Sequence, residues 1–254
     1  MRPRLITIPI SHFCEKARWA LDRAGVDYVE ERHVQGPSRL YSRRAGGTGT
    51  TPVLVTATGS LTESEDIVAF ADPSLRQRDP EVARITRWLD ENLGIPDRRL
   101  IYAHILPYPN LLLGFNNAGV PRWEDRTMRL AYRAIRPWAA QQLGLSSGAR
   151  ERDEALTLHA FDAVAQWLSD GRPFILGDAF TAADLTFAAL AAAVVGPPGY
   201  GTPLPQADQL PPEAAVMISR FREHPAGQFA LRLYREQRPA PPPDARSAPG
   251  TASS

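Results

Sequence analysis

The sequence predicts an α/β domain followed by an all-helical domain. Short β-branched runs alternate with helical apolar periodicity up to residue 75, whereas only helical patterns occur from Asp79 onward. A chain of 254 residues, of which 43% are hydrophobic and 22% charged, can bury the cores of two modest domains. We therefore expect an α/β domain over residues 1–75, a linker over 76–82, a helical domain over 83–238 and a disordered tail over 239–254 that is rich in proline, alanine and serine.

The first half has the expected order β-α-β, an irregular stretch, then β-β-α. Thr62 and Glu65 have the spacing of a capping box, which predicts the start of the last helix in this half. The glycine-rich stretch 36–52 shows no clear helix. Strands are expected over residues 5–8 and 27–34 and as a hairpin over 51–62, and helices over 13–24 and 62–72.

The second half is predicted to contain only helices. Thr181, Asp184 and the apolar run after them form the strongest helix start in the chain, and the small residues that follow favour a central helix packed on all sides. The segment 95–122 is long for a helix connection, so we expect it to be functional or partly helical. Further helices are expected over residues 80–93, 123–143 with a kink at Pro137, 151–169, 212–223 and 225–237.

Composition excludes several classes of protein. A net charge of +1 gives no electrostatic reason to expect binding to nucleic acid or to a membrane. The longest apolar stretch is about half of the roughly 20 residues that a spanning helix needs. The chain has one cysteine, which excludes an intrachain disulfide. Because the five histidines also lack the paired spacing of metal ligands, we expect no metal site. A cytoplasmic location is the expectation that fits these features.

Ser11 and Cys14 lie at the predicted start of the first helix. The stretch Ser11-His12-Phe13-Cys14 has the spacing of a redox C-x-x-C motif with its first cysteine replaced by serine. Ser11 is the expected N-cap residue, where free backbone N–H groups and the helix dipole favour an anion. Cys14 would lie at the third helical position and face the sheet or a neighbouring helix. An ordinary N-cap and a small buried side chain are the purely structural interpretations of the same two residues.

Four stretches in this order resemble the cytosolic glutathione transferases. They are SHFCEKARWAL after the first strand, TPVLV, TESEDIVAFA, and the capping box in FTAADLTFAAL. The resemblance extends over residues 4–237 and is to bacterial-type members with serine at the reactive-centre position. It implies a thioredoxin-like N-terminal domain, a helical C-terminal domain, a homodimer and a role in detoxification.

The resemblance also implies a reaction and a set of site residues. Ser11 would lower the pKa of the thiol of bound glutathione, or of a related thiol, so that the thiolate attacks a small electrophilic substrate between the domains. Thr51-Pro52 resembles the family's cis-proline turn, which frees the backbone of Val53 to pair with the ligand. The residues implied to bind the thiol are Phe13, Pro52, Val53, Glu63 and Ser64.

Two parts of the site, and two other functions, stay open. Arg39, Arg43 and Arg44 are unranked candidates for holding the glycine end of the thiol, because the stretch around them departs from the family pattern. The alternative functions are a thiol–disulfide oxidoreductase that uses Cys14 and a non-catalytic binding protein. Candidates for lining the acceptor pocket are Tyr102, His104, Tyr108, Phe115 and Trp123.

Overall fold

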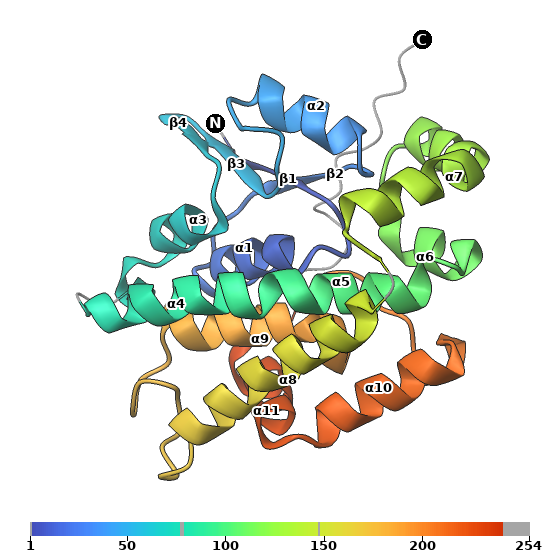
Figure 1. The fold of residues 1–254 in the computed structure, drawn as a ribbon. Coiled ribbons are helices and arrows are strands. Elements are labelled where there is room, and N and C mark those ends of the chain that lie inside the picture. Colours follow the sequence, from blue (N-terminus) through green and yellow to red (C-terminus); the bar gives the residue numbers. More distant parts are fainter. Residues whose placement is uncertain (1, 77–78, 147, 241–254) are drawn as a thin grey trace.

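The computed structural model describes residues 2–76, 79–146 and 148–240 (Figure 1). The expected tail therefore lies outside the described residues from position 241 onward, and so do two linker residues. The N-terminal α/β part consists of β1 (Arg4–Thr7), α1 (His12–Arg23), β2 (Val29–Arg32), α2 (Pro37–Arg44), β3 (Val53–Thr56), β4 (Gly59–Leu61) and α3 (Ser64–Ala71).

These strands form one sheet in the order β2-β1-β3-β4. β1 is parallel to β2 and antiparallel to β3, and β4 returns antiparallel to β3. α1 and α3 cover one face of the sheet and α2 covers the other (Figure 1). The end of β1, the start of β3 and the end of β4 consequently lie at one edge of the sheet, where Ile6 pairs with Val53 and Leu54 with Leu61.

Two local expectations for this domain were wrong. α2 occupies the stretch in which no helix was expected; Pro37 starts it after Gly36, and its buried positions are Ser38 and Ser42. Because serines fill the buried face, the helix has no apolar periodicity to detect. The Thr62–Glu65 capping box is absent: α3 begins at Ser64, its N-cap residue is Glu63, and no side chain caps it.

The helical part contains a helix at each expected position. The 95–122 segment was expected to be functional or partly helical, and it contains two further helices. α9 begins with the expected capping box of Thr181 and Asp184 and is buried on all sides. Pro137 lies inside α7 as expected. The elements are the 3₁₀ turn Pro73–Arg76, α4 (Pro80–Asn92), α5 (Gly94–Ile105), α6 (Pro109–Asn116), α7 (Arg122–Gln142), α8 (Ala149–Trp167), α9 (Ala182–Val195), the 3₁₀ turn Ala207–Gln209, α10 (Pro212–Glu223) and α11 (Pro225–Gln237).

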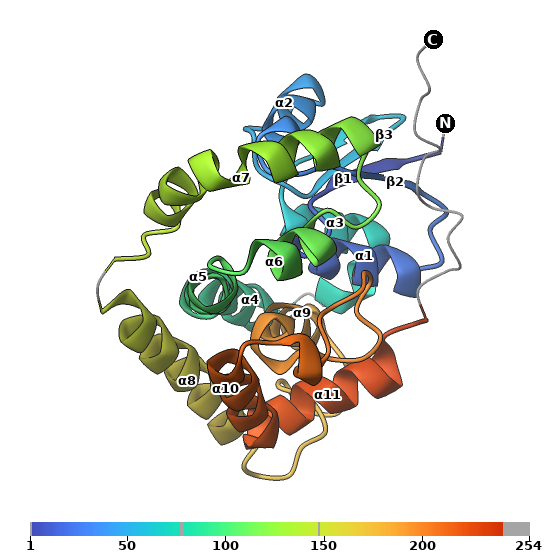
Figure 2. The same cartoon turned by 90° about the vertical axis from the view of Figure 1, so that its right-hand side faces the viewer.

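The main core surrounds α9. Figure 2 shows α9 enclosed by the other C-terminal helices, with α1 on the side of the sheet. α9 packs on α1 of the N-terminal part as well as on α4 and α11, so one apolar core joins both parts of the chain. No helix in the described residues is long and apolar enough to cross a membrane. The division into two domains at the boundaries given above remains our proposal.

Candidate functional site

Ser11 is the N-cap residue of α1, as predicted. Its Oγ accepts a hydrogen bond from the backbone N–H of Cys14 at 3.4 Å, and its backbone N–H bonds the carbonyl of Ile8 at 3.1 Å. The side chain is partly exposed. A hydroxyl that accepts this bond still has its own hydrogen to donate, and the Cys14 sulfur lies within its reach.

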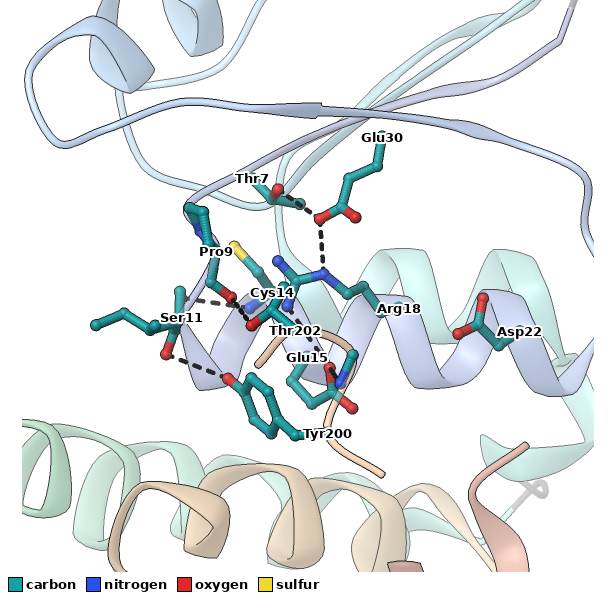
Figure 3. Close-up of polar contacts among 12 residues, drawn as sticks. Thr7, Pro9, Ser11, Cys14, Glu15, Arg18, Asp22, Glu30, Tyr200 and Thr202 are labelled. Atoms are coloured by element: carbon teal, nitrogen blue, oxygen red, sulfur yellow. Dashed lines mark hydrogen bonds and ion pairs between the residues drawn. The ribbon is translucent and has the colours of Figure 1, made fainter. Parts of the chain in front are cut away.

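Cys14 lies below Ser11 and is fully buried. In Figure 3 its sulfur points from α1 toward the strands, as expected for a packing residue. Burial raises the pKa of the thiol, although the charge of Arg18 and hydrogen bonds from Ser11 and Thr51 act in the opposite direction. The protein's own thiol is therefore protonated and inaccessible at neutral pH.

Val53 and Ser64 lie at the same edge of the sheet as Ser11. The Thr51–Pro52 bond is cis, as predicted, and Pro52 and Val53 are buried. Thr51 is also within hydrogen-bonding reach of Cys14, so the start of β3 adjoins the first turn of α1. Ser64 is largely buried and Glu63 is exposed at the uncapped start of α3. The structure thus brings five of the predicted site residues to one edge: Ser11, Pro52, Val53, Glu63 and Ser64.

Phe13 and His12 point elsewhere, toward the helical part. A Cβ atom placed on Gly94 would lie only 2.8 Å from Phe13 Cζ, so the ring packs against the start of α5. His12 Nε2 donates a hydrogen bond to the Gly94 carbonyl at 3.0 Å. Burial, together with the charge of Arg98, lowers the pKa of His12 to about 3. A neutral imidazole with so low a pKa accepts a proton only weakly, so His12 is a poor catalytic base.

A loop that sequence reasoning overlooked holds the turn before Ser11. The Tyr200 hydroxyl donates to the carbonyl of Ile10 at 3.2 Å, and the Thr202 hydroxyl donates to the carbonyl of Pro9 at 3.0 Å (Figure 3). The backbone N–H of Gly201 donates to Glu15 Oε2 at 3.0 Å. The only sequence signal was the stretch Pro-Pro-Gly-Tyr-Gly-Thr-Pro, in which two hydrogen-bonding side chains lie among turn-forming residues.

Buried charges hold the same turn from the sheet side. Arg18 Nε donates to Glu30 Oε1 at 2.7 Å, and its Nη2 donates to the carbonyl of Ile8 at 3.3 Å. Thr7 donates to the same Glu30 oxygen at 2.7 Å. Burial alone would raise the pKa of Glu30, but the charges of Arg18 and Arg32 outweigh it and lower the pKa to about 2. The pair is therefore ionised at neutral pH and joins β2 to the turn.

The acceptor-pocket candidates do not come together around Ser11. Tyr102 accepts a hydrogen bond from Gln35 at 3.2 Å, in the apolar cluster of α5–α7 against which Ile10 also packs. The groups that act electrostatically on His104 are Arg150, Glu213 and Glu154, so it faces α8 and α10. The remaining three are half-buried or exposed: Tyr108, Phe115 and Trp123.

The three arginine candidates for the glycine end can now be compared. Arg43 lies over the loop that leads to the cis-proline, because a Cβ on Gly49 would be 3.2 Å from its Nε. Arg39 turns away and places its guanidinium 5.9 Å from the ring centroid of Trp138 on α7. Arg44 is exposed at the end of α2. Arg43 is therefore the best placed of the three.

A cavity of about 660 Å³ lies apart from these residues. It is bounded by the loop after α9 on one side and by Arg18, Glu30 and Arg32 on the other. None of the predicted thiol-site residues lines it. Among the described residues, no group of three His, Cys, Asp or Glu side chains is placed to hold a metal ion.

Comparison with known proteins identifies the fold. Residues 5–76 match the family described as glutathione S-transferase, N-terminal domain. Comparison with curated proteins found no match. A glutathione transferase from Phanerochaete chrysosporium has a TM-score of 0.61 at 15% identity, covering 92% of this chain and 96% of that one. A glutathione S-transferase from Ceriporiopsis subvermispora, solved in complex with glutathione, has a TM-score of 0.60 at 19% identity, covering 95% and 100%.

A third structure is similar over nearly the whole chain. It is a glutathione S-transferase from Xanthobacter autotrophicus Py2, with a TM-score of 0.55 at 19% identity, covering 95% of this chain and 97% of that one. At sequence identities this low, the similarity establishes the fold but does not identify the substrate. Residues 5–76 thus match the glutathione S-transferase N-terminal domain, and the chain as a whole has the fold of the solved glutathione S-transferases.

Proposed function

We propose that this protein binds glutathione, or a related low-molecular-weight thiol, and transfers it to a small electrophile. The observation that carries the proposal is the contrast between two residues of one helix turn. Ser11 is partly exposed at the start of α1, whereas Cys14 is fully buried below it. The reactive sulfur must then come with the ligand, and the hydroxyl of Ser11 is the group that meets it.

The chemistry follows from the hydrogen bonding of Ser11. Its Oγ accepts the Cys14 N–H, and its hydrogen, which reaches the buried Cys14 sulfur in the absence of a ligand, would turn to a bound thiolate; the positive end of α1 favours the same negative charge. With an aryl halide, the thiolate forms a carbon–sulfur bond and the halide leaves with the bonding electron pair. The thiol proton passes to solvent before the attack.

The rest of the proposed thiol site uses the same sheet edge. The backbone of Val53 after Pro52 would pair with the ligand, and Ser64 and Glu63 would hold its γ-glutamyl group. The lack of a side-chain cap on α3 supports this role, because N–H groups of the first turn then stay available to a carboxylate. Arg43 would hold the glycine carboxylate. Phe13, which packs on Gly94 at the start of α5, would support the turn that holds Ser11 from the side of the helical part. Ile10 and Tyr102 would face the electrophile.

By resemblance we also propose a cytoplasmic homodimer with a role in detoxification. The Cys14-dependent oxidoreductase is the less favoured function, because a nucleophilic cysteine needs exposure and a lowered pKa. A non-catalytic thiol-binding protein would share the binding residues and lack turnover.

Turnover of a generic aryl halide by the wild type and two variants tests the proposal. We expect Ser11→Ala to lose most activity, since removing one hydrogen-bond donor to a developing charge typically costs about 100-fold. Cys14→Ala should keep its activity. Equal activity in the two variants would contradict the role of Ser11. Melting temperatures with a panel of thiols separate a binding protein, which would be stabilised without turnover, from an enzyme.

A further inference from the structure

α7 exposes large apolar side chains on its outer face. Leu130 is 87% exposed, Trp123 55% and Trp138 50%. Their spacing of seven and eight residues puts them in one stripe along the helix. In Figures 1 and 2, α7 lies at the periphery of the molecule beside α2. Single exposed apolar residues are common on protein surfaces, whereas several such side chains in one stripe indicate a binding face.

A row of arginines follows the apolar stripe. The residues recur at intervals of four and three, which keeps them on one side of the helix, and all are exposed. The only acidic residues of α7 are Glu124, which is buried, and Asp125, which pairs with Arg129. Among the described residues, no acidic partner is found for the other four. The row consists of Arg122, Arg126, Arg129, Arg133 and Arg136.

α2 extends the same face. The guanidinium of Arg39 lies 5.9 Å from the ring centroid of Trp138, so the two helices meet at this point. Leu40 is 49% exposed, and Arg43 and Arg44 are exposed beside it. We call this surface the α2–α7 face. It consists of Arg39, Leu40, Arg44, Trp123, Leu130, Trp138 and the five arginines of α7.

The arginine row is not a general property of this arginine-rich chain. On other helices several surface arginines have acidic partners, as in Arg84–Glu81, Arg220–Glu154 and Arg235–Glu236. The net charge of +1 averages over the whole chain and conceals the concentration of positive charge on two neighbouring helices. The expectation of no membrane partner rested on that average.

We propose that the α2–α7 face docks on the surface of an anionic lipid bilayer. The tryptophans and leucines would lie at the boundary between headgroups and acyl chains, and the arginines would bind lipid phosphates. A nucleic acid would satisfy the arginines but offers no apolar partner to Leu130 and Leu40. Docking of this kind lies on the bilayer without crossing it, and it stands independently of the transferase proposal.

Co-sedimentation with lipid vesicles tests the inference. The wild-type chain should sediment with vesicles of phosphatidylcholine mixed with phosphatidylglycerol, less with pure phosphatidylcholine, and less again at high salt. Arg126→Gln and Arg133→Gln should each weaken binding about fivefold. Leu130→Gln should weaken it similarly at unchanged charge. Val216→Gln on α10 and Arg235→Gln on α11 are the matched controls, since both residues are exposed and lie outside the α2–α7 face.

Three results would overturn the inference. One is equal sedimentation with both kinds of vesicle. Another is a DNA oligonucleotide that binds through the same arginines while Leu130→Gln has no effect, which would assign the face to nucleic acid. The third is a change of oligomeric mass in Leu130→Gln with unaltered vesicle binding, which would assign the face to a second copy of the chain. Thermal unfolding of every variant confirms that it is folded.

Discussion

The hydroxyl of Tyr200 donates a hydrogen bond to the carbonyl of Ile10 at 3.2 Å, across 190 residues of sequence. Ile10 immediately precedes Ser11, so the loop after α9 sets the position of the N-cap residue of α1. A group that acts on a thiolate through a hydrogen bond must be held within a few tenths of an ångström. Tyr200 is accordingly a positioning residue for Ser11.

Tyr200→Phe removes this hydrogen bond and keeps the ring in place. We expect a loss of about 1 kcal/mol of stability and, in addition, a raised pKa of the bound thiol together with a lower kcat. The pH profile of turnover measures the second effect.

Tyr132→Phe is the matched control, because the hydroxyl of Tyr132 is also buried and donates to a backbone carbonyl, that of Leu106. It should lose comparable stability with an unchanged pH profile. Identical profiles for both variants would mean that Tyr200 only stabilises the fold.

Glu30 makes stability depend on pH. Its folded pKa of about 2 lies below the ordinary value of 4.5, so its contribution is present above pH 4.5 and is lost as pH falls toward 2. The contribution amounts to roughly 3 kcal/mol. In Glu30→Gln the free energy of unfolding should be lower near neutral pH and should fall less steeply from about pH 5 to about pH 3. Denaturant unfolding at several pH values measures the slope, and parallel slopes would contradict this assignment.

Cys14 should resist modification in the folded protein. Because the thiol is buried and burial raises its pKa, little thiolate is present to react. We expect alkylation by iodoacetamide to be slow in the native protein and fast in denaturant, with mass spectrometry following the product. Rapid native alkylation, or a mixed disulfide with oxidised glutathione, would instead favour the oxidoreductase.

The sequence predicted the elements that depend on local patterns. The Thr181–Asp184 capping box, the helix that contains Pro137 and the N-cap Ser11 all follow from residue types at short spacing, and each is present. The cis bond before Pro52 followed from the resemblance and is also present. α2 was missed because its buried face consists of serines, which carry no periodic apolar signal.

The buried charges and the loop after α9 could not be predicted in this way. Arg18 is a charged residue that no local pattern marks as buried, yet it is buried with Glu30, twelve residues away, as its partner. Glu15 pairs with Arg238 at 2.8 Å across 223 residues. Such pairs depend on tertiary packing, which brings together residues that no local pattern connects.

The pKa of the bound thiol tests the central claim most directly. A spectrophotometric titration of thiolate absorbance in the glutathione complex compares the wild type with Ser11→Ala. A hydrogen bond to a charged group is worth about 1.5–3 kcal/mol, so the wild type should hold the pKa about 1–2 units below that of the variant. Equal pKa values in two proteins that both bind glutathione would contradict the role proposed for Ser11.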